Sequence, residues 1–362
     1  MKTDNMIKRL RSALVWLCGF IAPLLLGGVG GGLLTSCNDE WKDEQYEKYI
    51  SFKAPLNDNG VTAVYVPYSR HNDDGSLTYG QGISHYDLPV IVAGSTRNES
   101  NLTVHVGHSD TLQTLNYERF GSSTYRADIT DLYYKDMQQF ASYPETMQIN
   151  SGEDVGLLRI KFDFNNIDMV EKWVLPIEIK PDGSYQAHPR KNYAKAMLRV
   201  YPYNDYSGNY SATTLTITNA DDPDNATGME TARGYVVDDN TIFFYMGNID
   251  ESRVDRRHYK VFFRFTPTNE EGNQGTVELY TDNGDKNLFQ NKGTATYRVY
   301  EQIDEVRPYL LHHYIIISGI DYDYTDYTSV ADYPMAYTVK GILTLERQLN
   351  TQIPNEDQAI EW

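Results

Sequence analysis

Residues 337–345 read YTVKGILTL, and this alternation of side chains indicates the fold class. In an extended strand, every second side chain points to the same side. One face here would carry Tyr337, Val339, Gly341, Leu343 and Leu345. Residues 259–265, YKVFFRF, repeat the pattern, and one face there would carry Tyr259, Val261, Phe263 and Phe265. Such alternation is typical of antiparallel β-structure with one buried face.

Short β-branched and aromatic segments of the same kind occur along the whole chain, separated by Asn, Asp, Gly and Ser. They cover residues 49–52, 61–66, 88–92, 102–106, 147–149, 157–162, 173–179, 194–201, 275–280, 294–300 and 314–317. Helical periodicity is rare, and one short helix is expected over residues 110–117, with Leu112, Leu115 and Tyr117 facing inward. The sequence therefore predicts an all-β protein.

A domain boundary is expected near Pro202 to Gly208, where breaker residues coincide with a change of pattern. Residues 46–203 are then expected to form an immunoglobulin-like β-sandwich. Residues 204–350 are expected to form a second antiparallel β-domain, a barrel or a sandwich, with a calycin-like barrel as one form. The polar residues 351–362 are expected to be a tail.

The amino terminus has the order of charged and apolar residues that a secretory signal shows. Basic residues precede an apolar run from Ala13 to Leu26, and glycines then interrupt it, so the run is too short for a spanning helix of about 20 residues. The run ends in LTSC at residues 34–37, which resembles the lipobox of bacterial lipoproteins. This resemblance implies a signal peptide over residues 1–36 and lipidation of Cys37. The alternative is an ordinary signal peptide followed by an unmodified cysteine.

Residues 37–45 form an acidic stretch that resembles the export signal of outer-face lipoproteins in Bacteroidetes, or else a solvated tether. Both interpretations favour an outer-membrane protein that is held by its lipid alone and faces the cell exterior. The other cysteine, Cys18, lies in the signal, so no disulfide can form within a mature monomer. Removing residues 1–36 takes away four cations and Asp4, which changes the net charge from −18 to −21. Such a charge argues against nucleic acid as a partner.

Several motifs of the first half resemble an uncharacterised amino-terminal domain of Bacteroidetes surface lipoproteins. They lie at residues 88–92, 101–104, 110–116, 143–144, 149–153 and 174–177. The resemblance covers about residues 45–203, and the ending from Leu345 to Asn350 resembles the carboxy-terminal domain that accompanies it. Members of this family occur in glycan-utilisation loci, sometimes ahead of endo-β-N-acetylglucosaminidase domains. The resemblance carries no catalytic residue over to this chain.

Motifs for catalysis and metal binding give no consistent site. The acidic run from Asp321 to Asp326 superficially resembles that of chitinase-type glycosidases, but it lacks the terminal glutamate at the right spacing. The chain has no Gly-x-Ser-x-Gly elbow, and its only mature cysteine would be acylated. The adjacent His312 and His313 would not face one metal from a strand. We therefore expect no enzyme activity, no cofactor and no metal, although calcium bound by acidic loops at residues 321–326 or at residues 221–225 is an open alternative.

The best candidate for ligand binding is a run of tyrosines and aspartates between two predicted strands. The residues are Tyr322, Tyr324, Tyr327, Tyr333, Asp321 and Asp323. Aromatic faces pack against the C–H faces of a sugar ring, while carboxylates accept hydrogen bonds from its hydroxyl groups. These residues are therefore predicted to form a glycan site. The alternative is that the tyrosines cover one end of the second domain.

Together, these patterns predict a non-catalytic cell-surface lipoprotein that binds glycans for a polysaccharide or N-glycan uptake system. Its partners would be an oligosaccharide or polysaccharide and, in addition, components of an outer-membrane transporter. The alternative is a structural or assembly lipoprotein that contacts a transporter or another outer-membrane protein. The sequence does not identify the glycan or the oligomeric state.

Overall fold

The computed structural model describes residues 46–70, 81–120, 133–190 and 192–353. Cys37, the predicted signal peptide and tether, and the end of the predicted tail from residue 354 lie outside the described residues. Nearly all regular structure is β-strand, so the predicted all-β fold with two β-domains is confirmed. Among the described residues, no helix has the length and apolar character needed to cross a membrane.

The described residues of the first domain, which we call the sandwich, contain eleven strands. They are β1 (Tyr49–Phe52), β2 (Thr62–Pro67), β3 (Ile83–Ala93), β4 (Leu102–His108), β5 (Lys135–Asp136), β6 (Ala141–Ser142), β7 (Thr146–Ile149), β8 (Val155–Asp163), β9 (Trp173–Ile179), β10 (Gln186–Ala187) and β11 (Lys195–Tyr203). Helix α2 (Thr111–Phe120) and the 3-10 turn η2 (Gln138–Phe140) connect them.

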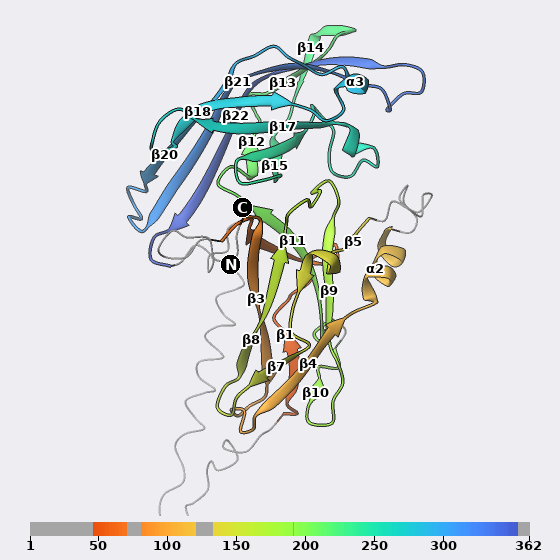
Figure 1. Cartoon of the computed structure of the whole chain (residues 1–362), viewed down its shortest axis with the longest axis vertical. Helices are drawn as coiled ribbons and strands as arrows, with labels where there is room; N and C mark the ends of the chain where they lie inside the picture. Colours follow the sequence, from red (N-terminus) through yellow and green to blue (C-terminus); the bar gives the residue numbers. More distant parts are fainter. Residues whose placement is uncertain (1–45, 71–80, 121–132, 191, 354–362) are drawn as a thin grey trace, which may run out of the picture. The chain divides into compact units, whose positions relative to one another are not determined.

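Two sheets make up the sandwich, with strand orders β10-β1-β3-β8-β6 and β2-β11-β9-β4-β7, the latter joined by β5 (Figure 1). Alternation positions their side chains: along β8, Leu158 and Ile160 are buried, while Arg159 between them is exposed. The buried side chains meet those of the second sheet, such as Val104, in one apolar core. The pairs β1–β10, β2–β11 and β5–β9 are parallel, which the alternating pattern does not reveal.

The second domain, which we call the barrel, also contains eleven strands in the part of the chain that the structure describes. They are β12 (Gly208–Ser211), β13 (Thr216–Asn219), β14 (Asp222–Gly228), β15 (Thr231–Val236), β16 (Thr241–Tyr245), β17 (Lys260–Pro267), β18 (Gln274–Tyr280), β19 (Gln290–Asn291), β20 (Ala295–Ile303), β21 (Leu310–Asp326) and β22 (Met335–Asn350). The short helix α3 (Gly284–Asn287) and the 3-10 turn η3 (Arg256–His258) lie between strands.

Eight of these strands close into a ring in the order β12-β15-β16-β17-β18-β20-β21-β22, because β22 pairs with both β21 and β12. Figure 1 shows the long neighbours β20, β21 and β22 side by side. Aromatic side chains such as Tyr259, Phe263 and Phe265 fill the interior. A cavity of only about 20 Å³ remains among them. The interior of an eight-stranded barrel is narrow enough for side chains to fill it, and here the buried residues form a packed core.

The sandwich and the barrel share part of their apolar packing. The outward-facing Tyr235, Phe243 and Phe262 of the barrel belong to the same buried cluster as the sandwich core. Arg256 of η3 is fully buried, and its Nε donates a hydrogen bond to the carbonyl oxygen of Val170 at 3.0 Å. Strand β17 is therefore apolar on both faces, because one face packs in the barrel interior and the other packs with the sandwich core.

Three local expectations are wrong. Residues 321–326 continue strand β21 after an irregularity in register near Gly319, and residues 222–228 form the exposed strand β14, so neither acidic stretch is a loop. Tyr117 is 65% exposed, whereas Leu112 and Asn116, one helical turn apart, form the buried face of α2. Asn116 fixes this orientation, because its Nδ2 donates to the carbonyl oxygen of Tyr134 at 2.9 Å.

Candidate functional site

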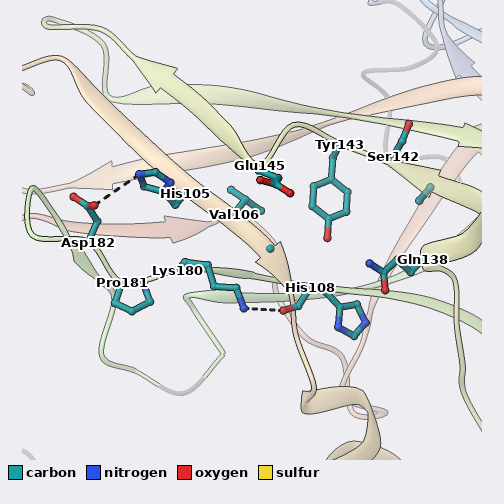
Figure 2. A pocket seen from close by; sticks show the side chains of 12 residues that line it. His105, Val106, His108, Gln138, Ser142, Tyr143, Glu145, Lys180, Pro181 and Asp182 are labelled. Carbon is teal, nitrogen blue, oxygen red and sulfur yellow. Dashed lines mark hydrogen bonds and ion pairs between the residues drawn. The ribbon is translucent and has the colours of Figure 1, made fainter.

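A pocket of about 620 Å³ opens on the sandwich beside strand β4. Its walls come from four separate segments: the end of β4, the turn η2, residues 141–145 and the loop that follows β9. Figure 2 shows Tyr143 and Glu145 on one side of the space and Lys180 and His108 on the other. The pocket therefore forms only when the sandwich folds and brings these four segments together.

Lys180 lines the pocket next to the end of strand β4. Its Nζ donates hydrogen bonds to the carbonyl oxygen of His108 at 2.9 Å and to Glu178 Oε1 at 2.7 Å. The side chain passes over Gly107, where a Cβ atom would lie 2.6 Å from Lys180 Cε. Any larger residue at position 107 would therefore push the Lys180 side chain out of this position. Burial raises the pKa of Glu178, but hydrogen bonds from Lys180 and Ser109 lower it by more, so this carboxylate is charged.

Both histidines of the pocket face carboxylates. His108 Nε2 lies 2.5 Å from Asp136 Oδ2, a hydrogen-bond distance, and His105 Nε2 lies 3.7 Å from Asp182 Oδ2. Hydrogen bonds from Ser184 hold the pKa of Asp182 below its ordinary value. These contacts with carboxylates hold the two imidazole rings in place at the edge of the pocket.

Tyr143 supplies the aromatic surface of the pocket. The side chain is half-buried, and burial together with Asp136 and Glu145 raises the pKa of its phenol, so the hydroxyl keeps its proton and can donate. Figure 2 shows the hydroxyl directed into the space toward the side of His108. Gln138 and Ser142, both exposed, add an amide and a second hydroxyl. An aromatic ring surrounded by such groups suits a ligand rich in hydroxyl groups.

A second pocket of about 380 Å³ lies at the start of β1 and is lined by Tyr46, Glu47, Tyr49, Ala93, Gly94 and His188. The imidazole of His188 lies between the rings of Tyr49 and Tyr193, with centroids 5.1 and 4.7 Å away. Its Nδ1 accepts a hydrogen bond from the backbone N–H of Arg190 at 3.1 Å. This aromatic pocket is smaller and has fewer polar side chains than the pocket beside β4, and it provides a useful comparison in binding experiments.

The structure does not assemble the tyrosine and aspartate site that the sequence predicts. Tyr322 and Tyr324 are 4% and 1% exposed, because they point into the barrel from β21. Tyr333 is 54% exposed and donates a hydrogen bond to Asp221 Oδ2 at 2.9 Å. Tyr327 is half-buried, and its hydroxyl accepts a hydrogen bond from Asn283 Nδ2 at 3.0 Å. The prediction of one exposed tyrosine surface is wrong because period-two alternation turns Tyr322 and Tyr324 into the core.

The same alternation separates the aspartates that were considered for calcium. Asp321 and Asp323 point outward and pair with Lys340 at 3.2 Å and with Lys292 at 2.6 Å. Asp326 lies on the inward face of β21 and therefore cannot share an ion with them. Among the described residues, no group of three or more His, Cys, Asp or Glu side chains is placed to hold a metal ion.

Asp326 instead stabilises the end of β21. It accepts hydrogen bonds from the Tyr259 hydroxyl at 2.9 Å and from the backbone N–H of Ser329 at 3.0 Å, and it pairs with Arg253 at 3.2 Å. Burial raises its pKa, but the hydrogen bonds, those from Ser329 above all, lower it by more, to well below the ordinary 3.8. A carboxylate whose pKa is lowered by folding stabilises the protein above its unfolded pKa, and this stability is lost as the pH falls through the folded pKa.

We therefore expect Asp326→Asn to lower the free energy of unfolding by about 1–3 kcal/mol at neutral pH. As the pH falls from 3.8 toward the lower folded pKa, the difference from the wild type should shrink, because the wild-type carboxylate takes up a proton in the unfolded state before it does so in the folded state. Denaturant unfolding at a series of pH values measures both effects. Asp224→Asn on the exposed strand β14 is the control and should change stability by less than about 0.5 kcal/mol. A difference that persists at low pH would contradict this explanation.

Comparison with known proteins places the chain in a family. Residues 41–183 match the model of a domain of unknown function, DUF4973. Residues 194–344 match a second family model, which is described as a C-terminal domain. An auxiliary nutrient binding protein from Bacteroides thetaiotaomicron is similar at 46% identity, over 88% of this chain and 100% of that one, with a TM-score of 0.76. No curated protein matches the chain.

Two further solved structures, both from Bacteroides ovatus, are similar. A multidomain protein including DUF1735 shares 40% identity over 87% of this chain and 100% of that one, with a TM-score of 0.71. A protein of unknown function shares 33% identity over 89% of this chain and 98% of that one, with a TM-score of 0.72. The predicted resemblance is confirmed to this extent: the chain belongs to the family of Bacteroides proteins that includes the auxiliary nutrient binding protein of Bacteroides thetaiotaomicron.

Proposed function

We propose that this protein is a non-catalytic lipoprotein of the outer cell surface that binds a glycan for uptake. In this proposal the ligand occupies the pocket beside β4. The observation that carries it is the pocket of about 620 Å³, in which the Tyr143 ring stands among amide, hydroxyl, imidazole and carboxylate groups. The relative from Bacteroides thetaiotaomicron, which is described as a nutrient binding protein, supports a binding role.

The location in the cell and the absence of catalysis rest on the sequence. The lipobox that ends at Cys37 and the acidic residues that follow it support export and anchoring at the outer face. The packed barrel supports a ligand that binds on the sandwich, because its cavity of about 20 Å³ leaves room for no more than one water molecule.

The test uses soluble protein that starts at residue 38, together with affinity gels or an array of plant and host glycans. We expect at least one glycan to retard the wild type, and Tyr143→Ala to weaken its binding about tenfold, because the ring face is lost. Circular dichroism would verify that the variant is folded. Retardation by none of the glycans would refute the proposal.

Two tyrosine variants serve as controls. Tyr117→Ala removes an exposed ring of α2 that lines neither pocket, and it should leave binding unchanged. Tyr193→Ala removes a ring from the cluster beside the second pocket. If Tyr193→Ala abolished binding and Tyr143→Ala did not, the glycan would occupy the second pocket.

Contact with an outer-membrane partner protein is the second candidate function. It is favoured by exposed apolar residues at the tip of the β20–β21 hairpin, where Ile303 is 61%, Val306 88% and Tyr309 41% exposed. Scattered exposed apolar residues are ordinary, but a cluster at one hairpin indicates a contact surface. A membrane partner that is captured without sugar, and that is lost in Val306→Asp, would support this function.

A further inference from the structure

We infer that the pocket beside β4 selects neutral glycans over those that carry carboxylate or sulfate groups, and that Glu145 is the residue responsible. This inference rests on the proposed function and specifies its ligand. It follows from how the ionisable side chains of the pocket are arranged: the basic side chains already lie beside carboxylates of the protein, whereas one carboxylate is left to face the ligand.

Each basic side chain of the pocket already has a carboxylate of the protein beside it. Lys180 Nζ lies 2.7 Å from Glu178 Oε1, and His108 Nε2 lies 2.5 Å from Asp136 Oδ2. His105 lies 3.7 Å from Asp182, which hydrogen bonds from Ser184 keep ionised. An anionic group on a sugar would therefore have to displace a carboxylate of the protein before it could pair with any of these basic side chains.

Glu145 is the carboxylate that remains. It lines the pocket, its residue is exposed, and among the described residues no cation lies within ion-pair distance of it. The net charge of the chain, −18, adds to the negative potential around the site. A like charge brought beside such a group is disfavoured, and specificity is often achieved in this way, by repulsion of the wrong ligand.

The remaining polar groups suit a neutral sugar. The Tyr143 hydroxyl, the Gln138 amide and the Ser142 hydroxyl carry no charge and can exchange hydrogen bonds with ring hydroxyl groups. Glu145 and Asp182 can accept further hydrogen bonds from such hydroxyls. The ligand class is therefore a chain of neutral hexoses, or of N-acetylated hexoses, whose hydroxyl and amide groups satisfy the pocket without a counter-ion.

The experiment compares three sets of oligosaccharides, neutral, uronate-containing and sulfated, on soluble protein from residue 38 at low ionic strength, where charge effects are least screened. We expect the wild type to bind neutral chains and to bind acidic chains at least tenfold more weakly. Glu145→Lys should raise the affinity for acidic chains about tenfold. Glu145→Gln, which keeps the size and the hydrogen-bonding oxygen, should raise it less and leave neutral binding within about twofold.

Glu118→Lys on α2 is the matched control, because it makes the same charge change at an exposed residue outside the pocket. It should leave the preference between neutral and acidic chains unchanged. Equal or tighter wild-type binding of acidic chains would overturn the inference while leaving the glycan function intact. An effect of Glu118→Lys as large as that of Glu145→Lys would overturn the role of Glu145. Binding of no glycan at all would instead refute the proposed function itself.

Discussion

Tyr324→Ala is expected to lower the free energy of unfolding by about 3–5 kcal/mol, the usual cost of removing a large buried aromatic side chain. Tyr324 is 1% exposed, and its ring stacks on Tyr337 at a centroid distance of 5.3 Å. Its hydroxyl fills the place of a side chain at Gly247, whose φ of +53° is left-handed. Because the barrel interior has almost no free volume, neighbouring residues cannot close the space that the ring leaves.

Denaturant unfolding followed by circular dichroism measures this loss, and Tyr333→Ala is the control. Tyr333 is 54% exposed, so its replacement should change stability by less than about 0.5 kcal/mol. The pair also separates the two interpretations of the tyrosine-rich segment. If Tyr324→Ala were as stable as the wild type and lost glycan binding, the exposed tyrosine site that the sequence predicts would be correct after all.

Arg256→Ala is expected to cost about 3–5 kcal/mol, because it removes a large buried side chain together with the hydrogen bonds that it donates to backbone carbonyl oxygens. Arg256 is fully buried, and its guanidinium donates hydrogen bonds to the carbonyl oxygens of Val170 at 3.0 Å and Arg253 at 2.8 Å. It also lies 3.7 Å from Glu171 Oε2. Since Val170 and Glu171 belong to the sandwich, the loss weakens the contact between the domains.

Unfolding monitored by tryptophan fluorescence and by circular dichroism tests this prediction, because Trp173 reports on the sandwich and the dichroism on both domains. Arg256→Lys should recover little stability, since an ammonium group cannot replace the planar set of donors. Arg264→Ala, which breaks an exposed pair with Glu278, should cost less than about 1 kcal/mol. Equal effects of Arg256→Ala and Arg264→Ala would contradict the role of Arg256.

The sequence predicts the strands of this protein well because side-chain alternation is a local property. It would also have predicted the strand at residues 321–326, where tyrosines and aspartates alternate, had the aspartates not suggested a loop. The adjacent Val261, Phe262 and Phe263 break the alternation, and the structure gives the reason: Phe262 packs with the sandwich core while its neighbours fill the barrel.

The candidate site could not be predicted in the same way. His105, Gln138, Tyr143 and Lys180 come from four segments, and only the pairing of β4 with β9 and the position of η2 bring them together. Tyr143 lies in a motif of the family resemblance, but nothing local distinguishes it from the other tyrosines of the chain. A site that is assembled by tertiary contacts leaves no periodic signal.

Strand β14 has a consequence for copies of this protein that lie close together, as they would in the proposed location on a cell surface. Among the described residues it pairs with β13 alone, so a row of its backbone donors and acceptors is left open at the edge of the sheet. Such edges invite neighbouring copies to add their own strands and aggregate. Asp222, Pro223 and Asp224 lie on this edge, where a missing N–H and two like charges oppose that pairing. The acidic sequence that resembled a calcium loop thus favours copies that remain separate when crowded.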